Sequence, residues 1–568
     1  MFKRSYKKLS SILLIFCMLS GMVSLTGCGF EAEEKTVTLN VYSMLANYSG
    51  MQTGWMADVL KEELNIKLNI TPLGNNAFET KMQEGDMGDI VVWGNDSNLY
   101  TKAVEEKLLY DWDKDNLLKE EGSYIAEHMQ SALRKNRELT SDITAGEENT
   151  LYGFGNSVAT SKNDHEGYIY TWDIRWDLYK QLGYPRLETL DDLVVILKEM
   201  CKLAPKNDEN EPTYAMTLWP DWDDAMVMYV KATATGYYGY DELGIGLYDP
   251  DTGTFHGALE ENGPYLNMLK FYNTLNQEGI LDPNSRTQSY EDANAKMAKG
   301  TAMCSIFNYA GQAFYNTSEH LEQGKAMLSK CPDESCPLGY GSSIEGRDRI
   351  WSIGANTKYP KRCMHLLNYL CTPEGRLTTE YGPKGLCWDY DSNHNTSLTK
   401  LGEMCMKNPD EKLENGYKGT FLDGKLKVGN ETWDINATNP ESNEETYNYL
   451  NWKSAWKNSV SDIEKDWQKR TGAINSTDYV DHRDHKITPA SDYHTGEKSE
   501  DLKRTWQAVT KELKDSSWKA IYAVNDEEYY QIVNDMIKNC EGAGYADCVE
   551  WSEGEAAKRF DSEKTIGE

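Results

Sequence analysis

The first 100 residues alternate between strand-like and helix-like segments, and this order restricts the fold more than any other feature of the chain. Residues 36–42 and 66–72 alternate apolar and polar side chains, and residues 89–93 form a short apolar run. Helical spacing of apolar residues occupies 54–64 and 78–84 between them. A strand–helix–strand–helix–strand order predicts a mostly parallel sheet with helices on its faces, and therefore an α/β fold.

The alternation continues beyond residue 100 and favours more than one domain. Further predicted strands are 151–154, 168–172, 301–307 and 350–354. Further predicted helices are 190–203, 221–233, 262–279, 360–370, 450–467, 501–513 and 526–538. The last quarter of the chain is therefore rich in helix, and 568 residues are enough for about two to four domains.

The charge of the chain argues against nucleic acid as a partner. It carries 91 Asp and Glu against 59 Lys and Arg, a net charge of −32, which phosphate groups would repel. Among the aromatic residues, 16 Trp and 36 Tyr stand against 11 Phe. Rings with a polar group are typical of amphipathic contact surfaces.

The N-terminal segment has the pattern of a secretory signal. Four basic residues within 1–8 precede an uncharged, mostly apolar run at 9–25. A transmembrane anchor is the alternative interpretation of such a run. Residues 25–28, Leu-Thr-Gly-Cys, resemble the lipobox of bacterial lipoproteins. That resemblance implies removal of residues 1–27 and lipidation of Cys28. Residues 28–36 would then be a short tether that anchors the protein to the extracellular face of the cell membrane of a Gram-positive bacterium.

Ten cysteines remain in the chain after the signal and Cys28 are set aside. Cys331–Cys336 and Cys540–Cys548 are close enough in sequence to be disulfides of an exported protein, and buried free thiols are the alternative. No Cys-x-x-Cys occurs in the sequence, and no Cys/His set has the spacing of a zinc site.

Several segments in order resemble one family. Residues 84–90 resemble its acidic turn before a strand, and 168–193, 299–303, 359–375 and 381–385 resemble further segments in the same order. The family is the extracellular, carbohydrate-type solute-binding proteins of bacterial ABC transporters. The resemblance runs from about residue 36 to 390, with Pro383-Lys384 as a departure.

The resemblance implies a type II fold of two α/β lobes that close on a sugar or oligosaccharide in the cleft. The expected lobes are 37–155 with 301–372, and 156–300 with the helix-rich 373–568. A monomer, an ABC permease as partner and no cofactor are further expectations.

Sugars stack their apolar faces on aromatic rings and bind planar amide, carboxylate or guanidinium groups through their hydroxyls. Such residues follow the predicted strands, where open sheets bind ligands. The candidates are Trp93, Asn95, Asp96, Arg175, Trp219, Asp221, Trp222, Tyr309, Trp351 and Trp388. For each ring the alternative is ordinary packing, and for Arg175 it is a structural salt bridge.

Two other classes of function stay open. A secreted glycoside hydrolase or lyase needs only two suitable carboxylates, although the sequence contains no common catalytic motif. A surface adhesin would bind glycans without transport. Asp111, Asp113 and Asp115 are spaced as in a calcium loop but lack its glycine and glutamate, and His482 and His485 fit a solvated loop better than a metal site. We therefore expect no catalytic residue and no metal.

Overall fold

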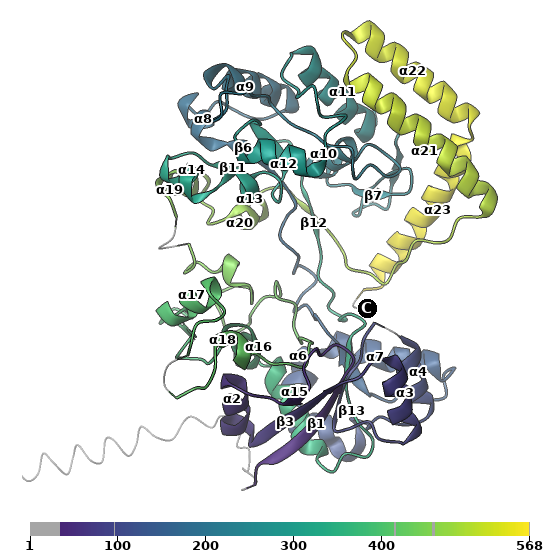
Figure 1. Ribbon diagram of the computed structural model, residues 1–568. Helices are drawn as coiled ribbons and strands as arrows, with labels where there is room; N and C mark the ends of the chain where they lie inside the picture. Colours follow the sequence, from purple (N-terminus) through teal and green to yellow (C-terminus); the bar gives the residue numbers. More distant parts are fainter. Residues whose placement is uncertain (1–34, 96, 414–415, 457–459, 567–568) are drawn as a thin grey trace, which may run out of the picture.

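The computed structural model describes residues 35–566 except 96, 414–415 and 457–459. The signal, Cys28 and Asp96 lie outside the described residues. The described chain forms two lobes, one above the other in Figure 1, with connecting segments between them. Within the described residues, no helix is long and apolar enough to cross a membrane.

The first lobe is built on a six-stranded sheet. Its order is β2 (Gly50–Met51), β3 (Ile66–Pro72), β1 (Val37–Ser43), β4 (Ile90–Val92), β13 (Ile350–Ile353) and β5 (Gly153–Gly155). Strands β3, β1 and β4 are parallel, whereas β13 runs antiparallel between β4 and β5. The predicted strands of the first 100 residues are thus confirmed.

Helices cover both faces of this sheet because its side chains alternate between two apolar clusters. Ile90 and Val92 of β4 join the cluster that contains α2 (Trp55–Leu64) and α15 (Pro360–Cys371). Val91 points into the other cluster, with α3 (Asn75–Gln83) and α4 (Ser97–Glu105). The remaining helices of this part are α5 (Leu117–Glu121), α6 (Ser123–His128) and α7 (Gln130–Ile143).

The second lobe repeats the strand order of the first. Here β6 (Tyr170–Arg175) runs antiparallel between β10 (Cys304–Phe307) and β11 (Met327–Ser329). Bridges extend this sheet, because Tyr214 pairs in parallel with Ala302 and Met216 pairs in parallel with Leu281. Apart from its edge strand β2, the first sheet has the order β3-β1-β4-β13-β5, and the second has the order Leu281, residues 214–216, β10, β6 and β11. In each sheet the fourth of these five strands, β13 or β6, runs antiparallel to its neighbours. This is the type II order, and the predicted fold class is confirmed.

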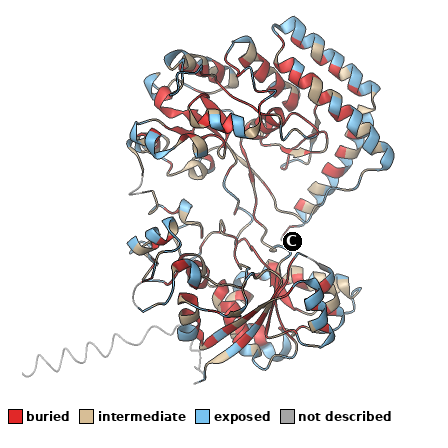
Figure 2. Cartoon of the chain, viewed as in Figure 1, coloured by how far each residue is buried: buried red, intermediate tan, exposed pale blue. Residues whose placement is uncertain are grey.

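The second lobe has its own core. That core joins α8 (Trp176–Gln181), α9 (Leu190–Leu203), α10 (Met228–Tyr238) and α11 (Pro264–Gln277) to one face of the sheet. The other face carries a smaller cluster that contains Met297 of α12 (Tyr290–Ala298) and Tyr315 of α13 (Gln312–Tyr315), and α14 (Ser318–Glu322) follows α13 in the chain. Figure 2 shows the buried residues gathered inside each lobe.

The C-terminal helices pack on the second lobe. They are α19 (Asp462–Thr471), α20 (Ser476–Asp481), α21 (Glu500–Ile521), α22 (Asp526–Gly542) and α23 (Tyr545–Lys564). The predicted helix at 450–467 is shorter than expected and begins at Asp462, where Ser461 and Glu464 form a capping box.

The expected lobe boundaries are wrong in two places. Residues 301–340 belong to the second lobe, because β10 and β11 pair with β6. Residues 373–452 belong to the first lobe, because Trp388, Trp433 and Trp452 lie in its core. The segment contains α16 (Pro373–Tyr381), β14 (Trp388–Tyr390), β15 (Thr396–Leu398), α17 (Lys400–Lys407) and α18 (Phe421–Gly424). Local patterns predict a strand, but the sheet that it joins depends on contacts distant in sequence.

A candidate binding site between the lobes

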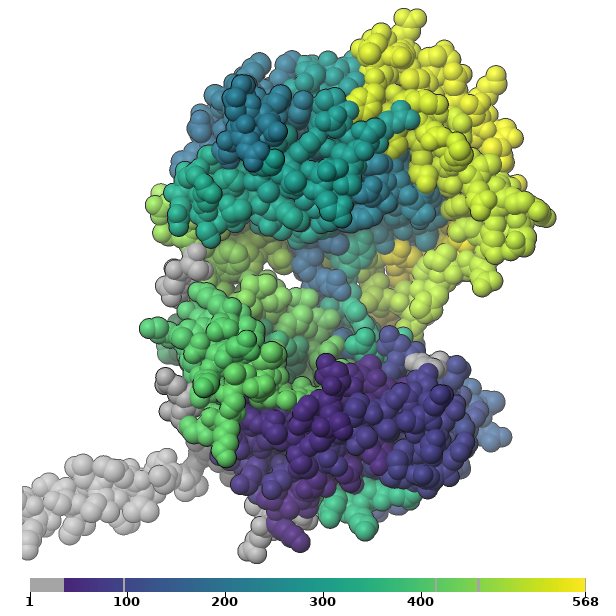
Figure 3. Space-filling view, in the orientation of Figure 1, coloured from purple at the N-terminus to yellow at the C-terminus, as the bar shows by residue number. Residues whose placement is uncertain are grey.

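The carboxyl ends of both sheets face the segments that connect the lobes. In the first lobe, β5 ends at Gly155, where the first connecting segment begins, and β13 receives the second one at Ile350. In the second lobe, the first connecting segment leads into β6. Because β6 runs antiparallel to β10 and β11, the start of β6 lies beside the carboxyl ends of these two strands. Figure 3 shows the surface hollowed between the lobes at this level. Ligands of open α/β sheets bind at such edges.

Four aromatic residues form a cluster at this edge of the second lobe; we call Trp219, Trp222, Tyr290 and Tyr309 the aromatic cluster. The ring centroid of Trp222 lies 4.6 Å from that of Tyr290, 6.1 Å from that of Tyr309 and 5.5 Å from that of Trp219. Trp219 is buried beneath, whereas 45% of Trp222 is exposed. The cluster therefore offers an indole ring to solvent on a rigid aromatic base.

Two carboxylates shape the loop that carries Trp222. Asp221 accepts a hydrogen bond from the backbone N–H of Tyr290 at the start of α12 (2.8 Å). Asp223 accepts from the backbone N–H of Met228 (2.7 Å) and from the indole Nε1 of Trp518 (2.7 Å). Burial raises the pKa of Asp223, and these two hydrogen bonds oppose the shift. The predicted helix at 221–233 consequently begins only at Met228, and the residues before it form a loop.

A polar pocket of about 340 Å³ lies between the lobes; we call it the interlobe pocket. Its walls come from the first connecting segment (163–165), from residues 436–453 of the first lobe and from residues 474–482 of the second. Across this lining, the side-chain amide of Asn475 donates to the backbone oxygen of Leu450 (3.1 Å) and to the side chain of Asn451 (3.2 Å). The two lobes thus meet directly in this pocket.

Most carboxylates of the interlobe pocket already have partners. Asp164 accepts from Thr438 Oγ1 (2.8 Å), which ties the connecting segment to the first lobe. Asp481 accepts from Tyr168 (2.8 Å) and lies 3.2 Å from Nε2 of His165. Burial disfavours charge on His165, but Asp481 raises its pKa above the usual value.

Other polar groups of the same pocket are available to a ligand. The side chains of Asn163, Asn443, Glu444 and Thr477 line it and make no hydrogen bond to the described part of the chain. Amide, carboxylate and hydroxyl groups provide both donors and acceptors. The pocket is therefore suited to a ligand rich in hydroxyl groups.

The aromatic cluster and the interlobe pocket are neighbours along the second lobe. Asn308, next to Tyr309 in the chain, donates to the backbone oxygen of Tyr168 (2.7 Å), and the hydroxyl of Tyr168 binds Asp481 of the pocket. Gln312 donates to Ser476 Oγ (3.0 Å), and Ser476 lies between the pocket residues Asn475 and Thr477 at the start of α20. Rings and polar groups thus follow one continuous edge.

The structure places the ten predicted residues differently from one another. Trp219, Asp221, Trp222 and Tyr309 come together in and beside the aromatic cluster. Asn95 lies across at the edge of the first lobe, exposed, and accepts from Nε of Arg349 (3.0 Å). Asp96 lies outside the described residues.

Three predicted rings are core residues instead. Trp93, Trp351 and Trp388 are at most 1% exposed. The Nε1 atoms donate to Ser352 Oγ, to the backbone oxygen of Glu431 and to that of Gly382, respectively. Large rings at strand ends are easily taken for ligand contacts, but here the helices of the first lobe cover them.

Arg175 is likewise structural. Its Nε and Nη2 donate to both oxygens of Asp177 (2.9 and 2.7 Å), and its guanidinium lies over the ring of Tyr315. The pair is buried, so it is not available to a sugar.

The sequence did not indicate Tyr290 or the walls of the interlobe pocket. Tyr290 follows Ser289, which caps α12, and this helix-start pattern was the available signal. The pocket walls 436–453 and 474–482 read as polar loops and helix in the sequence, because nothing local shows that they meet across two lobes.

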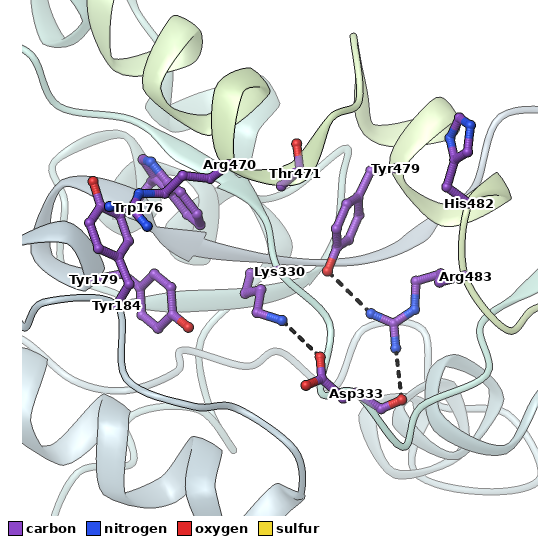
Figure 4. A pocket seen from close by; sticks show the side chains of 10 residues that line it. All are labelled: Trp176, Tyr179, Tyr184, Lys330, Asp333, Arg470, Thr471, Tyr479, His482 and Arg483. Atoms are coloured by element: carbon purple, nitrogen blue, oxygen red, sulfur yellow. Dashed lines mark hydrogen bonds and ion pairs between the residues drawn. The ribbon is translucent and has the colours of Figure 1, made fainter.

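A second cavity lies within the second lobe, on the flank formed by α8, α19 and α20, and has a volume of about 390 Å³ (Figure 4). The guanidinium of Arg470 covers the ring of Tyr184, 3.2 Å from its centroid. Lys330 is paired with Asp333 (2.9 Å), and Arg483 donates to the hydroxyl of Tyr479 (3.2 Å) and to backbone oxygens. Each cation therefore has a structural contact, and we do not include this cavity in the candidate site.

The groups considered for metal binding have other partners. Asp113 forms two hydrogen bonds with Arg137 (2.7 and 2.8 Å), and His482 lies 3.3 Å from Asp478. Within the described residues, no group of three or more metal-ligating side chains comes together. All ten cysteines of the described chain are free thiols, including the two pairs considered as disulfides.

Part of the chain is similar in sequence to a curated bacterial lipoprotein. The chain is 25% identical over 242 residues to lipoprotein LipO of Bacillus subtilis, a match that covers 40% of this chain and 45% of that protein. The chain thus spans about half the length of this curated relative. No family model matches the chain.

Solved structures with similar folds include two solute-binding proteins. One is the N-glycan transport solute-binding protein of Streptococcus pneumoniae, 13% identical, with a TM-score of 0.43 and coverage of 92% of this chain and 99% of the other. Another is an extracellular solute-binding protein of Bifidobacterium longum subsp. infantis, 13% identical, with a TM-score of 0.48 and coverage of 94% and 99%. The fold of this chain is established by the strand order of its own two sheets.

Proposed function

We propose that the chain is a binding protein that captures a sugar or oligosaccharide between its lobes and releases it unchanged to an ABC permease. The observation that carries the proposal is the exposed ring of Trp222, set in an aromatic cluster next to a polar pocket where the two lobes meet. Rings stack on the apolar faces of sugars, and the free amide, carboxylate and hydroxyl groups bind their hydroxyls.

The two-lobed fold suits transient capture. Each lobe has its own core, so the lobes can move relative to each other with the connecting segments as hinges. A ligand that contacts both lobes shifts the protein from the open to the closed form. The size of this shift is set by the difference between its affinities for the closed and the open form. Release to a permease requires that this difference stays moderate.

The charge of the interlobe pocket favours a neutral glycan. Its lining contains five carboxylates, namely Asp164, Glu444, Glu445, Asp478 and Asp481, against one lysine and two histidines. A carboxylate-bearing sugar would lose hydration next to like charges, which is unfavourable. We therefore expect neutral oligosaccharides to bind more tightly than uronate-containing oligosaccharides of the same length.

We further propose that Cys28 anchors the mature chain to the outer face of the cell membrane. The lipobox-like residues 25–28 and the basic, then apolar, leader support this proposal. The diacylglycerol of a lipidated cysteine binds a bilayer through its buried methylene groups. Globomycin treatment, which blocks lipoprotein signal removal, should leave the leader on the chain; unaffected processing would contradict lipidation.

Calorimetric titration of the full chain with neutral oligosaccharides tests the central proposal. Saturable binding with the glycan recovered intact is expected. New reducing ends would instead identify a glycoside hydrolase. Binding to immobilised polysaccharide, with no affinity for free oligosaccharide, would identify an adhesin.

A further inference from the structure

Two buried thiols of the first lobe lie against each other. Cys387 directly precedes β14, and Cys405 lies in the second half of α17. Both are 0% exposed, and the nearby thiol of Cys405 adds to burial in raising the pKa of Cys387. They are separate from the aromatic cluster and the interlobe pocket.

The backbone holds α17 close enough to bring the two thiols together. Thr399, which caps α17, donates its backbone N–H to the backbone oxygen of Cys387 (2.9 Å). Gly402 approaches so closely that a Cβ atom there would lie 1.9 Å from the same oxygen. Gly402 and Cys405 are three residues apart and both buried, so they share the helix face that meets Cys387.

The cysteine pairs that sequence spacing suggests are arranged differently. The thiol of Cys331 donates to the backbone oxygen of Thr171 (3.6 Å), and that of Cys540 to the backbone oxygen of Val509 (3.8 Å). Among the described residues, neither thiol is hydrogen-bonded to its possible disulfide partner, Cys336 for Cys331 and Cys548 for Cys540. The backbone contacts that join Cys387 to Thr399 and Gly402 of the α17 segment therefore favour the pair Cys387 and Cys405.

We propose that Cys387 and Cys405 form a disulfide when the chain folds in the presence of a disulfide oxidant. Each thiol loses its hydrogen, an S–S bond forms between the two sulfurs, and the two electrons and two protons reduce the oxidant's disulfide to two thiols. The inference rests on the export part of the proposed function, because such bonds persist mainly outside the cytoplasm.

The bond would fasten a part of the first lobe that supports the interlobe pocket. It closes the loop that contains β14 and β15. In that loop, the backbone N–H of Thr396 donates to Glu445 (2.6 Å), and its backbone oxygen accepts from Ser454 Oγ (2.7 Å). Glu445 lines the pocket. Closing the loop lowers the entropy of the unfolded chain and so stabilises the fold around this wall.

The timing of the reaction follows from burial. Burial raises the pKa of the Cys387 thiol to about 12 and that of Cys405 as well, so the reactive thiolate is rare in the native protein. We expect the bond to form during folding and to resist reduction afterwards.

The test is refolding of the purified full chain with either reduced or oxidised glutathione, followed by alkylation of free thiols, digestion and mass spectrometry. With oxidised glutathione we expect a cross-linked peptide that joins Cys387 and Cys405, two fewer alkylated thiols and a melting temperature several degrees higher. The Cys387→Ser variant should lose all three effects, whereas the Cys331→Ser/Cys336→Ser double variant should keep them.

Natively refolded protein in which Cys387 and Cys405 are both alkylated, or are joined to other cysteines, would overturn the proposal. If refolding fails, the same peptide analysis on protein exported by cells and alkylated at lysis decides the question. A glycan-binding protein with both thiols free overturns only the disulfide, whereas a disulfide-bonded protein without glycan affinity overturns only the proposed function.

Discussion

At the scale of single residues, Trp222 and Trp219 show how position within one loop separates an exposed ring from a buried one. The two rings are three residues apart, yet Trp219 is buried against Tyr229 while Trp222 projects into solvent. Truncation of an exposed tryptophan costs the protein little stability, whereas truncation of a buried tryptophan leaves a cavity that destabilises the fold. Substitution of Trp222 therefore tests the proposed ligand binding with little effect on folding.

We predict that Trp222→Ala lowers glycan affinity by about 10- to 100-fold, which corresponds to about 1–3 kcal/mol of a central aromatic contact. Its melting temperature should stay close to that of the wild type. Tyr530→Ala, at another exposed ring on α22, is the matched control and should retain affinity. Calorimetric titration measures both, and unchanged affinity in Trp222→Ala would remove the aromatic cluster from the site.

Asp173 is a buried acid that the proposed function does not use. It accepts hydrogen bonds from Thr171, Ser329 and Gln312 in the middle of the second sheet. Burial nevertheless raises its pKa to about 6. In the unfolded chain its pKa is about 3.9, so the folded state binds the proton more tightly.

We predict that this group makes the protein less stable as pH rises from about 4 to 6, with no further change above that window. Two pKa units correspond to about 3 kcal/mol at most. The difference in free energy of unfolding between the wild type and Asp173→Asn, measured in urea at pH 4 to 7, isolates the effect. The wild type should lose stability relative to the variant across the window, and a difference independent of pH would contradict the assignment.

At the scale of elements, the sequence predicts individual segments better than their partners. The alternation at β1 and β3 and the apolar run at β4 appear in the chain itself, and the structure confirms them. The placement of β10 and β11 in the second lobe depends on pairing with β6, more than 100 residues earlier for each. The interlobe pocket is missed for the same reason, since its walls are distant in sequence.

Helix α12 positions part of the aromatic cluster, because Tyr290 is the first residue of this helix. Ser289 and Asp292 form a capping box there, and such a cap stabilises a helix by about 1 kcal/mol. We predict that Ser289→Ala lowers stability by about that amount and also weakens glycan binding several-fold, because Tyr290 is less well held.

Ser461→Ala is the matched control for this prediction. It removes the equivalent capping box of α19, which holds no residue of the aromatic cluster. It should cost similar stability in urea unfolding without changing affinity. Equal affinity in both variants would show that the start of α12 does not position the cluster.

At the scale of the whole molecule, two lobes with separate cores meet through connecting segments and a few direct contacts. One contact joins Asn475 to Asn451 in the lining of the interlobe pocket, and another pairs Lys135 of α7 with Asp492 of the second lobe. The latter pair is solvent-exposed, so it contributes under about 1 kcal/mol. Such a weak pair would not prevent the opening and closing that the proposed function requires.

The most direct test of the central claim is small-angle X-ray scattering of the full chain with and without saturating neutral oligosaccharide, with the glycan analysed afterwards. We predict that the radius of gyration falls on binding and that the glycan is recovered uncleaved. An unchanged radius of gyration for every glycan, together with cleavage of any of them, would contradict the account.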